Sequence, residues 1–183
     1  MNSKAVFAYG RFNPPTVGHQ MMINKVINMA RRNGAKPFVV VTHTQNSKRN
    51  PLNQNEKINI LQARYPNVEF LRTSREEPRP GQLVNRLRKN GYKNLTLVVG
   101  SNRVNTFSRI MEPQNVRVVS AGNRNASAPG VAGMSATKVR AIAMNRNLKR
   151  FRECLMAGDS VNACKYMNYI KNRLTPVTKR KRI

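Results

Sequence analysis

Residues 10–19, GRFNPPTVGH, combine two glycines, two prolines and a histidine directly after a short apolar run. Gly10 allows the backbone to turn after a strand, and the prolines stiffen the loop. Gly18 removes a side chain where a helix begins, which leaves backbone N–H groups free to meet an anion. His19 falls in the first helical turn, where its ring can donate a hydrogen bond to a phosphate. The stretch therefore predicts a phosphate site; the alternative is a tight turn with His19 at the surface.

A second stretch with phosphate-binding chemistry is MSATKVR, residues 134–140. Hydroxyls and backbone amides at a helix start, with Lys138 and Arg140 in the first turns, make an anion site suited to the β- and γ-phosphates of a nucleoside triphosphate. Taken alone, the stretch is also consistent with an N-capped basic helix. Two such stretches, one at each end of a pattern of alternating strands and helices, support each other as parts of one site.

The elements that must position these stretches alternate along the chain. Apolar runs rich in β-branched residues predict five strands, at 5–9, 38–42, 68–71, 95–99 and 116–119. Amphipathic stretches of helical length lie between them, at 21–32, 56–65, 82–91 and 103–111. This alternation predicts an α/β fold with a Rossmann-like, doubly wound, mostly parallel five-stranded sheet. In such a sheet a ligand binds beyond the carboxyl ends of the strands, usually next to the first βα turn.

Local signals agree with this division. Asn53 and Glu56 have the spacing of a capping box at a helix start, and Gly34 and Gly91 lie where helices should end.

The last part of the chain returns to helical patterning at Ser135 and continues in two further helical stretches. We therefore expect a Rossmann-like domain over residues 1–146, C-terminal helices packed on it over 147–173, and a basic tail over 174–183.

The chain is strongly basic, with 34 Lys and Arg against 7 Asp and Glu and a formal net charge of +27. This balance favours nucleic acid or another polyanion as a partner; the alternative is a highly charged soluble surface with no specific partner.

No apolar run approaches the roughly 20 residues that span a bilayer, so we expect no membrane contact. Cys154 and Cys164 are too few for a disulfide framework and lack further zinc ligands, so we expect reduced thiols in the core.

The two phosphate-binding stretches resemble the motifs of one superfamily. TVGH, residues 16–19, resembles the TxGH form of the signature of the HxGH nucleotidyltransferase superfamily, which includes adenylyltransferases and cytidylyltransferases. MSATKVR resembles the ISSTxxR motif of the same superfamily, with Ser135, Thr137 and Arg140 matching and Ala136 in place of the second serine.

The resemblance is greatest to the nucleotidyltransferase-like proteins of tailed bacteriophages and covers about residues 4–145. It extends to the stretches at 43–61, 98–104 and 118–141. By analogy with these relatives, Lys48 and Arg49 lie on a mobile loop over the active site, and His43 is expected only to shape this loop.

The resemblance implies an enzyme that transfers a nucleoside monophosphate from ATP or CTP to a phosphorylated small molecule and releases pyrophosphate. Nicotinamide mononucleotide is the leading acceptor by the same resemblance. His19, Thr16 and Arg140 are implied as catalytic residues. The implied nucleotide- and phosphate-binding residues are Gly10, Arg11, Phe12, Asn13, Gly18, Lys48, Ser101, Arg103, Ser135, Thr137 and Lys138. Mg²⁺ is expected to arrive on the triphosphate, without a metal site in the protein, because the first turn supplies no carboxylate.

Two positions depart from the phage relatives, which carry acids where this chain has Asn102 and Asn125. The lost acids and the high charge lead to a second hypothesis, in which a weakened or inactive nucleotidyltransferase fold serves as a basic DNA-associated virion protein. The expected location is the host cytoplasm or, under the second hypothesis, the virion. An oligomer is compatible with the resemblance, since several enzymes of the superfamily are oligomers.

Overall fold

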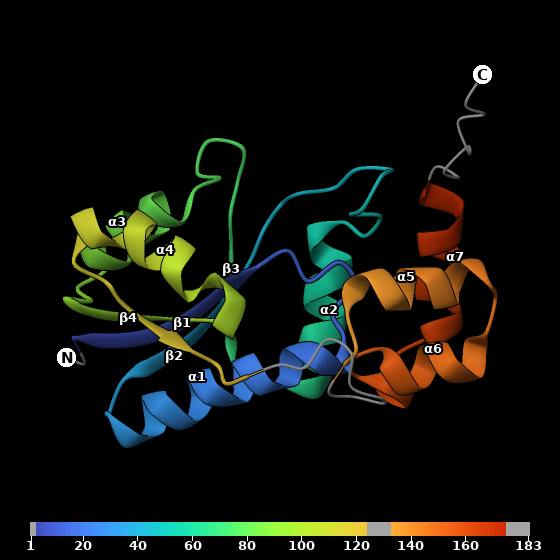
Figure 1. The fold of residues 1–183 in the computed structure, drawn as a ribbon, viewed down its shortest axis with the longest axis horizontal. Coiled ribbons are helices and arrows are strands. Elements are labelled where there is room, and N and C mark those ends of the chain that lie inside the picture. Colours follow the sequence, from blue (N-terminus) through green and yellow to red (C-terminus); the bar gives the residue numbers. More distant parts are fainter. Residues whose placement is uncertain (1–2, 124–132, 175–183) are drawn as a thin grey trace.

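A computed structural model describes residues 3–123 and 133–174 (Figure 1). Asn125 and nearly all of the expected basic tail therefore lie outside the described residues. The centre is one sheet of five strands: β1 (Lys4–Gly10), β2 (Lys36–Val41), β3 (Glu69–Arg72), β4 (Asn94–Val99) and β5 (Arg117–Ser120). Their order is β3-β2-β1-β4-β5 and all four pairings are parallel. The predicted Rossmann-like α/β fold is confirmed.

Helices connect the strands and continue after the sheet. They are α1 (Gln20–Arg32), α2 (Gln54–Arg64), α3 (Pro80–Lys89), α4 (Val104–Met111), α5 (Ala136–Met144), α6 (Leu148–Cys154) and α7 (Ala163–Arg173). In Figure 1, α1 lies on one side of the sheet and α3 and α4 on the other, while α5, α6 and α7 gather beside α2. The predicted C-terminal helices are therefore present.

The two faces of the central strand explain why helices cover both sides of the sheet. Ala5 to Ala8 of β1 are all at most 2% exposed. Successive side chains of a strand point to opposite faces, so Phe7 packs in the core with Leu83 of α3, whereas Val6 packs with Val26 of α1. The continuous apolar run of β1 therefore requires cover from both layers.

Local signals placed the helix ends correctly. The Asn53 side chain accepts from the N–H of Glu56, and the Glu56 carboxylate accepts from the N–H of Asn53, which confirms the capping box at the start of α2. Gly34 and Gly91 follow helices with φ of 57° and 91°, a left-handed conformation that favours glycine.

Both cysteines are free thiols. Cys154 is buried in the core as predicted, but Cys164 is exposed. The prediction of a core position was wrong for Cys164, which lies on the solvent side of the first turn of α7, opposite the buried Ala163 and Met167.

The C-terminal helices share one apolar core with the Rossmann-like part. Val139 of α5, Phe151 of α6 and Ile170 of α7 are fully buried with Leu61 of α2. A polar contact reinforces this packing, because the Arg173 guanidinium donates to both carboxylate oxygens of Glu56 at 2.6 and 2.9 Å. The boundary between residues 1–146 and 147–173 stays a prediction. Within the described residues, no helix combines the length and apolar character needed to cross a bilayer.

We expect Glu56→Ala to lower the free energy of unfolding by about 2 kcal/mol, because it removes the carboxylate of the capping box, which is also the partner of Arg173. Urea denaturation followed by circular dichroism measures the loss. Glu153→Ala is the matched control, since its carboxylate pairs with Arg150 on the exposed surface and should contribute little. Equal losses for the two variants would contradict the structural role of Glu56.

Candidate functional site

A cleft of about 740 Å³ opens at the carboxyl edge of the sheet. Its walls come from the first turn, from the ends of β1, β4 and β5, from the segment between β2 and α2, and from α5. The strand order reverses between β1 and β4, and ligands of open α/β sheets bind at this point. The cleft therefore occupies the expected position.

Buried contacts fix the first turn that lines the cleft. Phe12 is 2% exposed and has a φ of 46°, an unfavourable conformation for a bulky residue that the surrounding packing must stabilise. Asn13 is also buried; its side chain donates to the carbonyl of Leu52 at 2.8 Å and accepts from the N–H of Leu52 at 2.9 Å. The first turn is thus joined to the residues that precede α2.

Thr16 sets the orientation and tautomer of His19. The Thr16 N–H donates to His19 Nδ1 at 3.0 Å, and Thr16 Oγ1 lies 3.0 Å from the same nitrogen. Because Nδ1 accepts a hydrogen bond, the hydrogen of the neutral ring lies on Nε2. The Phe12 ring meets the His19 ring edge-on, with centroids 5.0 Å apart. His19 lines the cleft, whereas Thr16 is buried beneath it.

Gly18 allows the first motif to approach the second. A Cβ atom at this position would lie 2.1 Å from the carbonyl oxygen of Met134, which precedes α5. Two backbone segments therefore pass so closely that no side chain fits between them. The glycine is required by this packing, in addition to the anion chemistry that the sequence suggested.

Arg140 connects the two motifs directly. Its guanidinium donates to the carbonyl of Asn13 at 2.8 Å and to Thr137 Oγ1 at 3.0 Å. Burial lowers the pKa of Arg140, and the nearby guanidinium groups of Arg11 and Arg49 lower it further. The second motif thus brings a half-buried cation to the first turn and to two more arginines.

Basic residues gather around the cleft. Arg11, Arg49, Arg103 and Arg140 all line it, and none of the described lining residues is Asp or Glu. Within the described part of the chain, the side chains of Arg11, Arg49 and Arg103 have no hydrogen-bond or ion-pair partner. Guanidinium groups bind phosphate oxygens through paired N–H donors. The arrangement therefore suits a ligand with several phosphate groups.

Nine of the predicted site residues line the cleft and five do not. Those that line it are Gly10, Arg11, Phe12, Asn13, Gly18, His19, Arg103, Thr137 and Arg140, whereas Thr16, Lys48, Ser101, Ser135 and Lys138 lie outside the lining. The Ser135 hydroxyl instead accepts from the N–H of Lys138 as the cap of α5, and the Lys138 ammonium donates to the carbonyl of Gly133 at 3.0 Å. Of the two basic residues assigned to the loop, Arg49 reaches the cleft.

Several lining residues were missed from the sequence. Tyr9, Thr42, Asn50 and Phe107 all line the cleft. Thr42 is 6% exposed and its hydroxyl has no hydrogen-bond partner. The signal that could have found Thr42 is its place at the end of the apolar run at 38–42, because the ends of neighbouring parallel strands meet at one edge.

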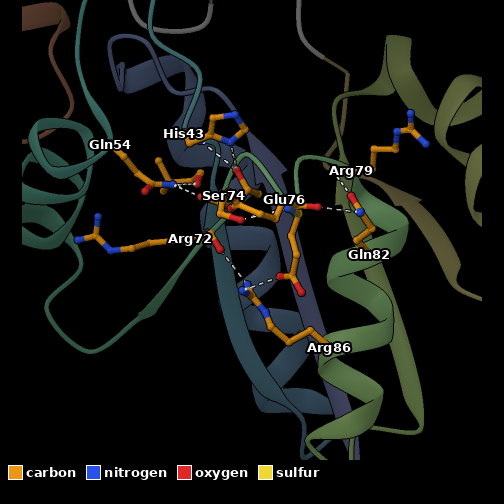
Figure 2. A network of polar contacts seen from close by, with 11 residues as sticks. His43, Gln54, Arg72, Ser74, Glu76, Arg79, Gln82 and Arg86 are labelled. Carbon is orange, nitrogen blue, oxygen red and sulfur yellow. Dashed lines mark hydrogen bonds and ion pairs between the residues drawn. The ribbon is translucent and has the colours of Figure 1, made fainter.

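A network of polar contacts joins the ends of β2 and β3 to the segment before α3 (Figure 2). The Gln54 amide donates to the carbonyls of Val41 and Thr73, at 2.8 and 3.0 Å, and so holds the ends of β2 and β3 together. The His43 N–H donates to the Thr73 hydroxyl at 2.9 Å, in agreement with a loop-shaping role for His43. The Tyr9 hydroxyl donates to the carbonyl of Pro78 at 2.5 Å. These contacts therefore fix the carboxyl ends of β1, β2 and β3.

Comparison with known proteins assigns the family. Residues 7–151 match the family described as cytidylyltransferase-like. The chain belongs to this family. The match covers the second half of β1, the other four strands, the cleft and both phosphate-binding motifs of this cytidylyltransferase-like protein. A comparison with curated protein sequences gave no match. The resemblance to phage proteins stays a prediction.

The oxygen atoms around the cleft suit a metal that arrives with its substrate. In the part of the chain that the structure describes, no group of three or more His, Cys, Asp and Glu side chains could hold a metal ion. Asn102 offers a neutral amide oxygen at the cleft. Mg²⁺ often binds through substrate phosphates with few protein ligands. This donor set fits Mg²⁺ held mainly by a triphosphate.

We expect Gly18→Ala to lower the free energy of unfolding by about 1–3 kcal/mol and to abolish ATP binding, because its new methyl group forces the two motifs apart. Thermal unfolding and calorimetric titration with ATP measure the two effects. Gly34→Ala serves as the control: no atom lies within 4 Å of its added Cβ, so it should cost about 1 kcal/mol of backbone strain and leave ATP binding unchanged. Normal ATP affinity in Gly18→Ala would contradict the packing argument.

Proposed function

We propose that the protein transfers a nucleoside monophosphate from ATP or CTP to a phosphorylated small molecule, with release of pyrophosphate. The observation that carries the proposal is the hydrogen bond from Arg140 to the Asn13 carbonyl, because it assembles both motifs around a cleft with four arginines and no acid. Nicotinamide mononucleotide is the first acceptor to test.

The reaction is a displacement at the α-phosphorus of the nucleoside triphosphate. A phosphate oxygen of the acceptor forms a bond to this phosphorus, and the bond from the phosphorus to the bridging oxygen of the β-phosphate breaks. The bonding electron pair leaves with pyrophosphate. No covalent enzyme intermediate is needed, because alignment of the two anions and neutralisation of their charge can supply most of the acceleration.

His19 is proposed to donate from Nε2 to an oxygen of the α-phosphate. The bond from the Thr16 N–H to Nδ1 supports this role, because it keeps the hydrogen on Nε2 and fixes the ring orientation. Thr16 is thus a positioning residue in the proposed mechanism, consistent with its burial below the cleft.

Different arginines are proposed to bind different phosphate groups. Arg140 and Thr137, from the second motif, hold the departing pyrophosphate, and Arg11 and Arg49 hold the attacking phosphate beside it. Repulsion between two phosphorylated substrates is a main obstacle to the reaction, and positive groups on both sides lower it. Mg²⁺ bound to the triphosphate would neutralise part of the remaining charge.

We expect His19→Ala to reduce pyrophosphate release from ATP or CTP by about 10²–10³-fold, the usual loss for one donor to a developing charge. A coupled pyrophosphate assay with a panel of acceptors, including nicotinamide mononucleotide and phosphopantetheine, measures the rate. His43→Ala is the matched control, since His43 is the other histidine of the chain and does not line the cleft. No turnover by the wild-type protein across the whole panel would contradict the enzymatic proposal.

A second candidate function is binding to nucleic acid, and the distribution of ion pairs favours it. Five acids pair with five bases in the described residues. The whole chain has 34 Lys and Arg against 7 Asp and Glu, so the acids are too few to neutralise most of its basic side chains. Such cations bind DNA phosphates without sequence preference. This function would use the outer surface and does not require the cleft.

We expect binding to duplex DNA to weaken by at least about 10³-fold between 50 and 200 mM salt, because six or more phosphate contacts would release counterions. Fluorescence anisotropy measures the affinity. Removal of residues 175–183, which contain KRKR, should weaken binding, whereas His19→Ala should not. Affinity that does not change with salt would exclude this function.

A further inference from the structure

Lys57 is a fully buried lysine directly behind the cleft. It lies in the first turn of α2 and is 0% exposed. Its ammonium donates to the carbonyl of Thr42 at 2.5 Å and to the carbonyl of Thr44 at 3.3 Å. These two backbone carbonyls are its hydrogen-bond partners, and neither carries a charge. The chain thus places a cation one residue from the cleft wall, between two neutral acceptors.

The charged groups near Lys57 either pair with other residues or lie in adjoining segments without contacting it. Glu56, its neighbour in α2, pairs with Arg173 of α7. His43, in the segment that Lys57 contacts, contacts Thr73, and Arg72 at the end of β3 donates to Asn55. The remaining cations of the adjoining segments are Lys48 and Arg49 before α2, Arg64 at its end and Arg140 of α5. Among the described residues, no carboxylate forms an ion pair with Lys57.

Burying a cation without a paired anion costs desolvation free energy, so a buried lysine at this position suggests a functional role. An apolar side chain at this fully buried position would avoid the desolvation cost of a charge. Burial accordingly lowers the pKa of Lys57 to about 8. An anion bound in the cleft would stabilise the charged form, and the charged form would attract the anion by the same free energy.

Lys57 also fixes the backbone that shapes one wall of the cleft. The Thr42 N–H donates to the carbonyl of Gly10 and the Thr42 carbonyl accepts from Lys57, so the residue is held from both sides. Thr42 is one of the residues that line the cleft, and its buried hydroxyl has no hydrogen-bond partner. At the far end of the segment, the Asn46 side chain accepts from the N–H of Arg49 at 2.9 Å. Hydrogen bonds therefore fix the backbone at both residues of this segment that line the cleft, Thr42 and Arg49.

We propose that Lys57 is a positioning residue for the substrate phosphates: its ammonium holds residues 42–44 so that the Thr42 hydroxyl and the Arg49 segment face the phosphates, and its charge strengthens their binding. The inference rests on the proposed nucleotidyl transfer and deepens it, because it makes phosphate affinity depend on the protonation of one lysine outside the cleft. The Thr42 hydroxyl is the direct donor, and Lys57 acts through it.

The sign of the pH dependence follows from the charge. Phosphates bind better to the form with protonated Lys57, so affinity is highest below the pKa of Lys57 in the unliganded protein and falls as the pH rises above it. With that pKa near 8, the fall begins near pH 8. Loss of one nearby positive charge should weaken binding about tenfold. ATP itself does not change charge in this range, because the last pKa of a phosphate monoester lies near 6.

The experiment is calorimetric titration of the full chain with MgATP at several pH values from 7.5 to 9.5. The wild-type protein should lose about tenfold in affinity across this range. Lys57→Arg keeps a charge that does not titrate here, so it should bind with little dependence on pH. Lys57→Gln keeps a donor without the charge and should bind about tenfold more weakly at pH 7.5, again with little dependence on pH. Lys89→Met, on the exposed surface of α3, is the control and should behave as the wild type.

Unfolding midpoints and circular dichroism identify any variant that does not fold, and Lys57→Gln decides the question if arginine does not fit the buried position. A pH dependence of Lys57→Gln equal to that of the wild type would overturn the inference while leaving nucleotide binding intact. Wild-type protein that binds no MgATP at any pH would contradict the proposed function itself, and the inference with it.

Discussion

The hydrogen bond between the Arg140 guanidinium and the Asn13 carbonyl is the contact on which the site depends. It joins residues 127 positions apart, at 2.8 Å. The Asn13 side chain is in turn bonded to Leu52 in both directions, so three separate segments meet at one turn. Gly18 permits this meeting because its missing Cβ leaves room for the Met134 carbonyl. The cleft is therefore a product of tertiary packing at the sheet edge.

The fold was predictable because its signals are local and repeated. Each strand is a short apolar run, and every connection has the length of a helix, which in a parallel sheet leaves few topologies. The Asn53 and Glu56 capping box and the left-handed glycines at 34 and 91 were correct for the same reason, since each depends on residues close in sequence.

The site was predictable only where a motif carried it. His19, Arg140 and the first turn were found, and the structure brings them together at the cleft. Thr42 and Lys57 were missed because their positions depend on which strands are neighbours and on what lies behind them. The phosphate-binding roles of Ser135 and Lys138 stay predictions: in the structure the Ser135 hydroxyl caps α5 and the Lys138 ammonium donates to the Gly133 carbonyl.

The few acids of the chain serve its structure. Glu56 supports the cap of α2 and binds Arg173, and Glu77 pairs with Arg86, while the part of the cleft lining that the structure describes contains no acid. The two kinds of cation at the site then differ in a useful way. The guanidinium of an arginine presents paired donors to a phosphate, whereas burial lowers the pKa of Lys57 behind the wall to about 8. Under the proposed function, the fixed positive charge of the arginines binds the phosphates, and the one titratable charge of Lys57 behind them adjusts the affinity.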